Sequence, residues 1–313
     1  MEEKSTEHSK AWDQYWQGRE GEDALVCEGV EDDSALVDFW RGVFSDHSGS
    51  VLDIACGSGS VLRLAQAAGC ASLTGLDIAE GAISNLAARV EGAIGVLGSA
   101  ADLPFDNGAF DLVVSQFGLE YAGVKQAAAE AGRVVADGGS LVLLCHYQGG
   151  VLEQDVRHRE QAARGILEVE YFTHGRRFFE TAYAAMARQA GSEEAFNAAM
   201  KNFDPAVKRV QAIAGEPNQP LAAHLLNGSH QLFERRQSYA LEDVLAWLSG
   251  MEGEVLAFLE RMESMRAACL GEGDVREVMQ ILQQAGLHGQ APEAFYFAEG
   301  EEPGAWILRA KKG

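Results

Sequence analysis

The chain has 313 residues, of which 47% are hydrophobic, enough for one large domain with an insertion or for two domains. Twenty-five Lys and Arg against 47 Asp and Glu give a net charge of -22. This charge would repel nucleic acid and anionic membranes, so neither is an expected partner. The five cysteines include no C-x-x-C pair, which argues against a zinc ribbon or a disulfide framework.

The first residues, MEEKSTEHSKAWDQYW, are charged and lack the apolar core of a signal peptide. No stretch approaches the ~20 apolar residues of a membrane span. We therefore expect a cytoplasmic protein without a membrane segment, whose oligomeric state the sequence leaves open.

Strand-like and helix-like segments alternate through the first half of the chain. Apolar runs predict strands at 51–55, 72–77, 93–100, 110–117 and 140–147. Apolar residues at helical spacing predict helices at 61–65, 83–90 and 127–135. A DGG turn at 137–139 separates the last of these helices from the fifth strand. Such alternation predicts an α/β fold with a doubly wound, mostly parallel sheet.

From about 150 to 273 the pattern becomes mostly helical, with Gly, Pro and Asn breaks and no fixed-period repeat. A helix at 275–286 follows, and then two strand-like runs that are close enough to form an antiparallel hairpin. The expected sheet therefore has seven strands. The predicted organisation is an N-terminal cap and first part of the α/β domain at 1–149, a helical insertion at 150–273, and a final helix and hairpin at 274–313.

The loop after the first predicted strand, CGSGS at 56–60, is built from small residues. Gly57 and Gly59 permit positive φ and the close approach of a ligand, so they indicate either a tight turn or a ligand cradle. The backbone N–H groups there could bind a pyrophosphate or a carboxylate. A dinucleotide fingerprint would need a third glycine where Leu62 stands, and no Lys-Ser or Lys-Thr completes a P-loop.

The run LDIACGSGSVLRLA at 52–65 resembles motif I of the class I S-adenosylmethionine-dependent methyltransferases. Its acidic residue is Asp53, and Ala55 stands where that family usually has its first glycine. The segments GSAADLPFDNGAFDLVVSQFGLEYA and EAGRVVADGGSLVLL resemble later blocks of the same family, in the same order. The resemblance covers about 51–146 and the terminal hairpin. It implies a Rossmann-like methyltransferase fold and S-adenosyl-L-methionine as the cofactor.

The resemblance also implies roles for single residues. Asp77, at the end of the second strand, would accept hydrogen bonds from the ribose hydroxyls, and Asp102 would contact the adenine amino group. Gln116 and Phe117 would lie beside the methionine part, and AWDQYW at 11–16 resembles a segment that covers the cofactor in small-molecule methyltransferases. The implied cofactor-binding residues are Asp53, Ala55, Gly57, Gly59, Asp77, Ile78, Ala101, Asp102, Leu103, Gln116 and Tyr15.

A sulfonium methyl group is already activated, so the protein must mainly orient a nucleophile and exclude water, without a metal. A hydroxyl acceptor benefits from a general base, whereas a neutral amine or a thiolate does not require one. The candidate catalytic residues are Glu120 and Tyr121 after the fourth strand and His146 after the fifth, with His146 the best candidate base by position. Further candidates near the reaction are Tyr147, Trp12 and Trp16.

The helical insertion follows the fifth strand directly, which predicts a lid over the pocket and hence a small-molecule acceptor. Within it, His174, Arg176 and Arg177 could bind an anionic substrate group or form a solvated helix face. The expected function is methyl transfer to an O, N or S atom of a small molecule. The alternatives are another reaction with the same cofactor, an NAD-dependent oxidoreductase and a non-catalytic binding module.

Overall fold

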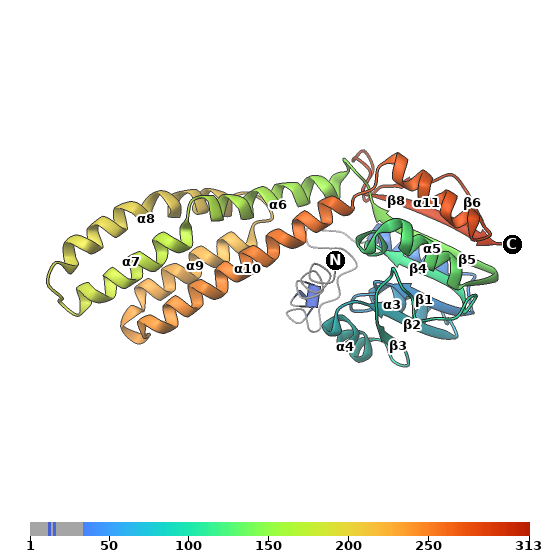
Figure 1. Cartoon of the computed structure of the whole chain (residues 1–313), viewed down its shortest axis with the longest axis horizontal. Coiled ribbons are helices and arrows are strands. Elements are labelled where there is room, and N and C mark those ends of the chain that lie inside the picture. Colours follow the sequence, from blue (N-terminus) through green and yellow to red (C-terminus); the bar gives the residue numbers. More distant parts are fainter. Residues whose placement is uncertain (1–11, 14, 17–33) are drawn as a thin grey trace. The chain divides into compact units, whose positions relative to one another are not determined.

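The computed structural model covers residues 1–313 and describes Trp12, Asp13, Tyr15, Trp16 and residues 34–313. The chain forms two compact units, one made of Met1–Asp155 with Ser264–Gly313 and the other of Val156–Glu263. We call them the α/β unit and the helical unit; Figure 1 shows the elements of both.

The α/β unit is built on one sheet, whose strands pair in the order β3-β2-β1-β4-β5-β8-β6, with β7 also paired to β8 (Figure 1). Strands β1 to β5 pair in parallel, and β8 runs antiparallel to β5. Successive strands lie to one side from β1 to β3 and to the other side from β4 onward, which is the predicted doubly wound order. The strands are β1 (Ser50–Ile54), β2 (Ser72–Asp77), β3 (Ile94–Leu97), β4 (Phe110–Gln116), β5 (Val135–His146), β6 (Leu287–Gly289), β7 (Glu293–Phe295) and β8 (Ala305–Lys312).

Helices cover both faces of this sheet, because its central strands are apolar on both sides. Along β1, Leu52 and Ile54 join one buried cluster, whereas Val51 joins the other. The first cluster is completed by α5 (Val124–Val134) and α11 (Glu272–Gln284). The second is completed by α2 (Ser34–Phe44), α3 (Ser60–Ala67) and α4 (Glu80–Arg89).

The C-terminal strands confirm the expected antiparallel hairpin and add one strand to it. β7 pairs with the start of β8, with Phe295 opposite Ala305. The sequence missed β6, which pairs with the other end of β8 and places Leu287 opposite Lys312. A three-residue strand carries no measurable alternation, so its partner β8 determines it. The described sheet therefore has eight strands where seven were expected.

The predicted DGG turn at 137–139 is wrong as a boundary between elements. β5 begins at Val135 and runs through these residues to His146. Its register against β4 shifts between Phe110 and Leu112, which pair with Val135 and Ser140. The small residues therefore accommodate an irregularity inside the strand, with Gly138 at a φ of +74°.

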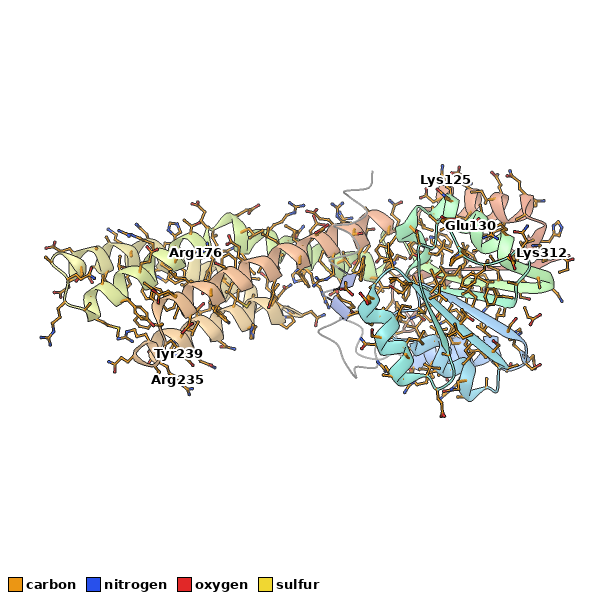
Figure 2. The ribbon with its side chains drawn as sticks, turned by 60° about the horizontal axis from the view of Figure 1, so that its bottom comes forward. Lys125, Glu130, Arg176, Arg235, Tyr239 and Lys312 are labelled. Atoms are coloured by element: carbon orange, nitrogen blue, oxygen red, sulfur yellow. The ribbon has the colours of Figure 1, made fainter. Side chains whose placement is uncertain are left out.

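The end of α5 is tied to the last strand by Lys312, which Figure 2 labels at the C-terminal end of the chain. Its Nζ donates to the carbonyl oxygens of Val135 at 2.8 Å and Gly132 at 3.2 Å. A cation is favourable at the C-terminal end of a helix, where carbonyl groups remain unpaired.

The helical unit has its own apolar core. Its largest fully buried side chains are Tyr171 and Phe179, and the Tyr171 hydroxyl lies 3.1 Å from Ser229 Oγ. The chain enters this unit within α6 and leaves it within α10. Its helices are α6 (Val151–Glu168), α7 (Tyr171–Met186), α8 (Ser192–Ala214), α9 (Pro220–Glu234) and α10 (Leu241–Ala268).

Glycine was expected to break the helices of this region, but α10 is continuous through Gly250 and Gly253. Glycine inside a helix costs about 1 kcal/mol relative to alanine. Burial of Leu248, Met251 and Val255 in the helical core offsets that cost. In the part of the chain that the structure describes, no helix combines the length and apolar character needed to span a bilayer.

Candidate functional site

The glycine loop joins β1 to α3, at the carboxyl edge of the parallel strands. Gly57 has a φ of +51° and Gly59 a φ of +83°, which L side chains rarely adopt. A Cβ on Gly57 would lie 2.5 Å from the Trp16 indole, and one on Gly59 would lie 2.4 Å from Leu86 Cδ1. Both positions therefore need glycine. Leu62, where a dinucleotide site would have its third glycine, is fully buried in the core.

Ala55 lies in the left-handed region, with a φ of +58°. This is the position at which the family usually has glycine, so alanine is present here at some cost in backbone strain. Its Cβ also explains Gly118, because a Cβ on Gly118 would lie 2.2 Å from it. The β1 and β4 ends thus approach closely at Ala55 and Gly118.

Asp77 at the end of β2 is buried and holds the glycine loop. Its Oδ2 accepts the Gly57 N–H at 2.9 Å, and its Oδ1 accepts the Ala79 N–H at 2.9 Å. Burial raises the pKa of Asp77, and the N–H donors of Ala79, Gly57 and Ile78 oppose that shift. The structure therefore brings Asp77, Ile78 and the glycine loop together.

Asp53 on β1 is the unusual member of this group. It is 1% exposed, and neither carboxylate oxygen has a hydrogen-bond partner among the residues that the structure describes. Burial, followed by the negative charge of Asp77, raises the pKa of Asp53 well above its usual value. A buried acceptor without a donor is costly, so this arrangement suits a ligand that supplies a donor, such as an ammonium group.

The residues Ala101, Asp102 and Leu103 lie in the loop between β3 and β4. Asp102 is exposed, and its backbone N–H donates a hydrogen bond to the Ser99 carbonyl oxygen at 3.1 Å. Leu103, in contrast, is 3% exposed. The side chain of Asp102 is therefore accessible to a ligand, and Leu103 anchors the loop in the core.

Two residues of α5 that the sequence analysis missed hold this loop. Arg133 donates to the carbonyl oxygens of Leu103 at 2.9 Å and Phe105 at 2.7 Å, and Glu130 accepts the Leu103 N–H at 2.9 Å. Arg133 also pairs with Glu130 at 2.7 Å, and this pairing lowers the pKa of Glu130. Figure 2 labels Glu130 on α5. In the sequence, EAGR places an acidic and a basic residue three positions apart. This spacing predicts that they can pair on a helix, but it does not predict that they bind the loop before β4.

Gln116 and Phe117 end β4. Gln116 Oε1 accepts a hydrogen bond from the Trp40 indole N–H, a contact across 76 residues that the sequence analysis missed. Phe117 has a φ of +54°, and its ring centroid lies 4.6 Å from that of His146. The structure thus directs Gln116 to α2 and Phe117 to the end of β5.

The three candidate catalytic residues lie together. Glu120, in the short 3-10 helix η1 (Leu119–Ala122), has its Oε1 2.8 Å from His146 Nδ1. The same oxygen accepts the His146 backbone N–H at 2.9 Å. The Tyr121 ring meets the imidazole edge to face at 5.8 Å. The side chains of Glu120 and His146 are both almost completely buried.

The described residues of the N-terminal segment contact this region. Asp13 Oδ1 accepts the Gly81 N–H at 2.8 Å, and the Trp16 carbonyl accepts Asn85 Nδ2 at 2.9 Å. Tyr15 packs against Trp12 and Trp16, and Trp12 packs against Tyr121. Ala11 and Gln14 of the predicted cofactor cover lie outside the described residues.

The remaining candidates have other contacts. Tyr147 stacks on Trp306 at 4.4 Å. In the helical unit, Arg176 pairs with Glu252, Arg177 lies 3.5 Å from Glu180, and His174 lies 4.0 Å from Glu170. Figure 2 labels Arg176. These pairings favour the helix-face interpretation over an anion site.

Residues 52–143 match the family model described as a methyltransferase domain. A search of curated proteins gives no match. Three similar solved structures illustrate the likeness. One is a structure described under the conversion of a disulfide bond into a thioacetal group during echinomycin biosynthesis. It is 26% identical to this chain, the alignment covers 48% of this chain and 63% of the other, and the TM-score is 0.38.

The YcgJ protein from Bacillus subtilis is 23% identical, with 42% of this chain and 59% of YcgJ covered and a TM-score of 0.35. CalS10, an amino pentose methyltransferase from Micromonospora echinaspora solved with S-adenosylmethionine bound, is 25% identical, with coverages of 37% and 51% and a TM-score of 0.31. The chain therefore covers less than two thirds of the length of each of these structures.

Proposed function

We propose that this protein transfers the methyl group of S-adenosyl-L-methionine to an O, N or S atom of a small molecule. The match of residues 52–143 to a methyltransferase domain supports this proposal. The bound cofactor supplies a methyl carbon that is already activated for in-line displacement. The protein's own residues must bind and orient the reactants and exclude water.

The observation that carries this proposal is the Asp53 carboxylate. It is buried beside the glycine loop, and no donor reaches it from the described residues. The ammonium group of a bound methionine moiety would satisfy it, directly or through water. A nicotinamide dinucleotide offers no ammonium group, and the buried Leu62 also disfavours that cofactor.

The other residues have roles consistent with this assignment. Gly57 and Gly59 would let the backbone approach the methionine carboxylate and the ribose, and Asp77 would accept the ribose hydroxyls while keeping its loop contacts. Asp102 would bind the adenine amino group. The proposed residues around the cofactor also include Ala55, Ile78, Ala101, Leu103, Gln116 and Tyr15.

Charge and chain order support a small acceptor. The net charge of -22 disfavours nucleic acid as the acceptor. The helical region at 150–273 begins four residues after His146 in the chain. Because of this short connection, we propose that the region covers the substrate.

Isothermal titration calorimetry tests the cofactor assignment. We expect S-adenosylmethionine and S-adenosylhomocysteine to bind and NAD not to bind. Asp77→Ala should weaken binding by about 1–3 kcal/mol, because it leaves polar partners unpaired. Asp137→Asn, an exposed acid on β5, is the matched control and should bind normally. Binding of NAD alone, or unchanged affinity in Asp77→Ala, would contradict the assignment.

A further inference from the structure

The Glu120–His146 pair joins the carboxyl ends of two neighbouring parallel strands. Glu120 follows β4 and His146 ends β5. One carboxylate oxygen receives both the backbone N–H of His146 and the Nδ1 of its ring, at 2.9 and 2.8 Å. Two contacts to one residue fix the imidazole ring relative to the carboxylate.

These contacts also determine which ring nitrogen is free to accept a proton. A carboxylate oxygen that already accepts one N–H can only attract a donor at Nδ1, so Nδ1 carries hydrogen. In the neutral ring, Nε2 therefore has a lone pair. Nε2 is buried and has no hydrogen-bond partner among the described residues. An orphaned buried nitrogen is costly unless a ligand meets it.

The surroundings of the ring are mostly aromatic. Phe117 lies 4.6 Å from the imidazole and Tyr121 lies 5.8 Å from it, and Trp12 packs on Tyr121. The other titratable neighbour on β5 is Cys145, whose thiol pKa is raised by burial and by the charge of Glu120. The Cys145 thiol therefore stays protonated and neutral beside the pair. A site of this kind excludes water from a proton transfer.

We propose, on the basis of the proposed methyl transfer, that His146 Nε2 is the general base, that Glu120 orients it, and that the acceptor is an alcohol or a phenol. The acceptor's O–H proton passes to Nε2, and a lone pair of the same oxygen forms the bond to the methyl carbon. The carbon–sulfur bond breaks, and its electron pair stays on sulfur. The imidazolium, stabilised by Glu120, then returns the proton to water. A thiolate or a neutral amine would need no such base to attack.

The first test requires no acceptor. Two-bond proton–nitrogen NMR spectra of the 15N-labelled protein, with His146→Asn to identify the signals, report which ring nitrogen is protonated. With S-adenosylhomocysteine bound, we expect hydrogen on Nδ1 and a bare Nε2 in the neutral form of the His146 ring. Hydrogen on Nε2 of that neutral ring would overturn the proposal.

The second test separates the base from the cofactor site. His146→Asn keeps an amide donor for Glu120 but removes the base, and Glu120→Gln keeps an acceptor but removes the charge. Both should bind S-adenosylhomocysteine within about twofold of wild type in calorimetry. Their kcat should fall, by about 10²–10⁴-fold for His146→Asn and at least about tenfold for Glu120→Gln. His288→Asn, on an exposed part of β6, is the control.

The acceptor class is tested with 3-hydroxybenzoate, 3-aminobenzoate and 3-mercaptobenzoate and with the same three groups on an alkyl chain, following S-adenosylhomocysteine release. Methylation of a hydroxyl compound that depends on His146 supports the proposal. Methylation of amines or thiols at wild-type rate in His146→Asn overturns the base while leaving methyl transfer intact. If the wild-type protein does not bind S-adenosylhomocysteine, that result would instead reject the proposed function itself.

Discussion

At the scale of single residues, Asp53 shows a conflict between stability and binding. Its folded pKa lies above its unfolded value, so the folded state holds the proton more tightly. The stability of the wild-type protein should therefore fall as pH rises from about 3.9, the unfolded value, to the folded pKa, and then stay level. Asparagine cannot ionise and does not lose this stability.

We therefore expect Asp53→Asn to be more stable than wild type at neutral pH, with no gain below about pH 4. Urea denaturation at several pH values measures this difference. The same variant should bind S-adenosylmethionine more weakly, since it lacks the charge for the ammonium group. A variant less stable than wild type at pH 7 would show that Asp53 is satisfied in the free protein.

Ala55 gives a second prediction at this scale. Its positive φ costs about 1–2 kcal/mol for an L side chain, and glycine removes this cost. Glycine also gives the unfolded chain more conformational entropy, which lowers the stability of the folded protein by up to about 1 kcal/mol. Ala55→Gly should therefore be as stable as wild type or up to about 1 kcal/mol more stable. Ala198→Gly, at an exposed position in α8, should lose about 1 kcal/mol in the same denaturation experiment. An equal loss in both variants would argue against strain at Ala55.

At the scale of elements, α5 supports the loop that carries Asp102. Arg133→Met removes the donors to the Leu103 and Phe105 carbonyl oxygens and the ion pair with Glu130. We expect a loss of about 1–2 kcal/mol in unfolding free energy and weaker S-adenosylhomocysteine binding, because the loop is less fixed. Hydrogen exchange of residues 99–107 should become faster. Arg276→Met, on an exposed part of α11, should leave exchange and binding unchanged.

The elements also show where sequence patterns suffice. Strand β2 occurs at Ser72–Asp77 as predicted, because its apolar run is bounded by clear turn residues. The strand β6 and the continuous helix α10 were not predicted. In both cases the deciding interaction comes from a distant partner: β8 for Leu287–Gly289, and the helical core for residues 250–253.

At the scale of the whole molecule, the two units have separate apolar cores. Separate cores can unfold in separate steps. We expect two transitions in differential scanning calorimetry, and S-adenosylhomocysteine should raise the midpoint of the α/β unit, to which the site residues belong. Phe179→Ala, in the core of the helical unit, should lower the other midpoint. A single transition that both changes shift equally would indicate one cooperative unit.

The sequence by itself determined the order of strands β1 to β5 and of the helices between them, the glycine loop after β1, and the carboxylates Asp53 and Asp77 on β1 and β2. These features depend on local periodicity and on short motifs, which a single sequence carries. Only the tertiary structure decided that Glu120 Oε1 meets His146 Nδ1, that Trp40 binds Gln116, and that Arg133 holds the loop before β4. These contacts join residues 26 to 76 positions apart. Their geometry depends on the register of paired strands and on how helices pack over them, which no local pattern specifies.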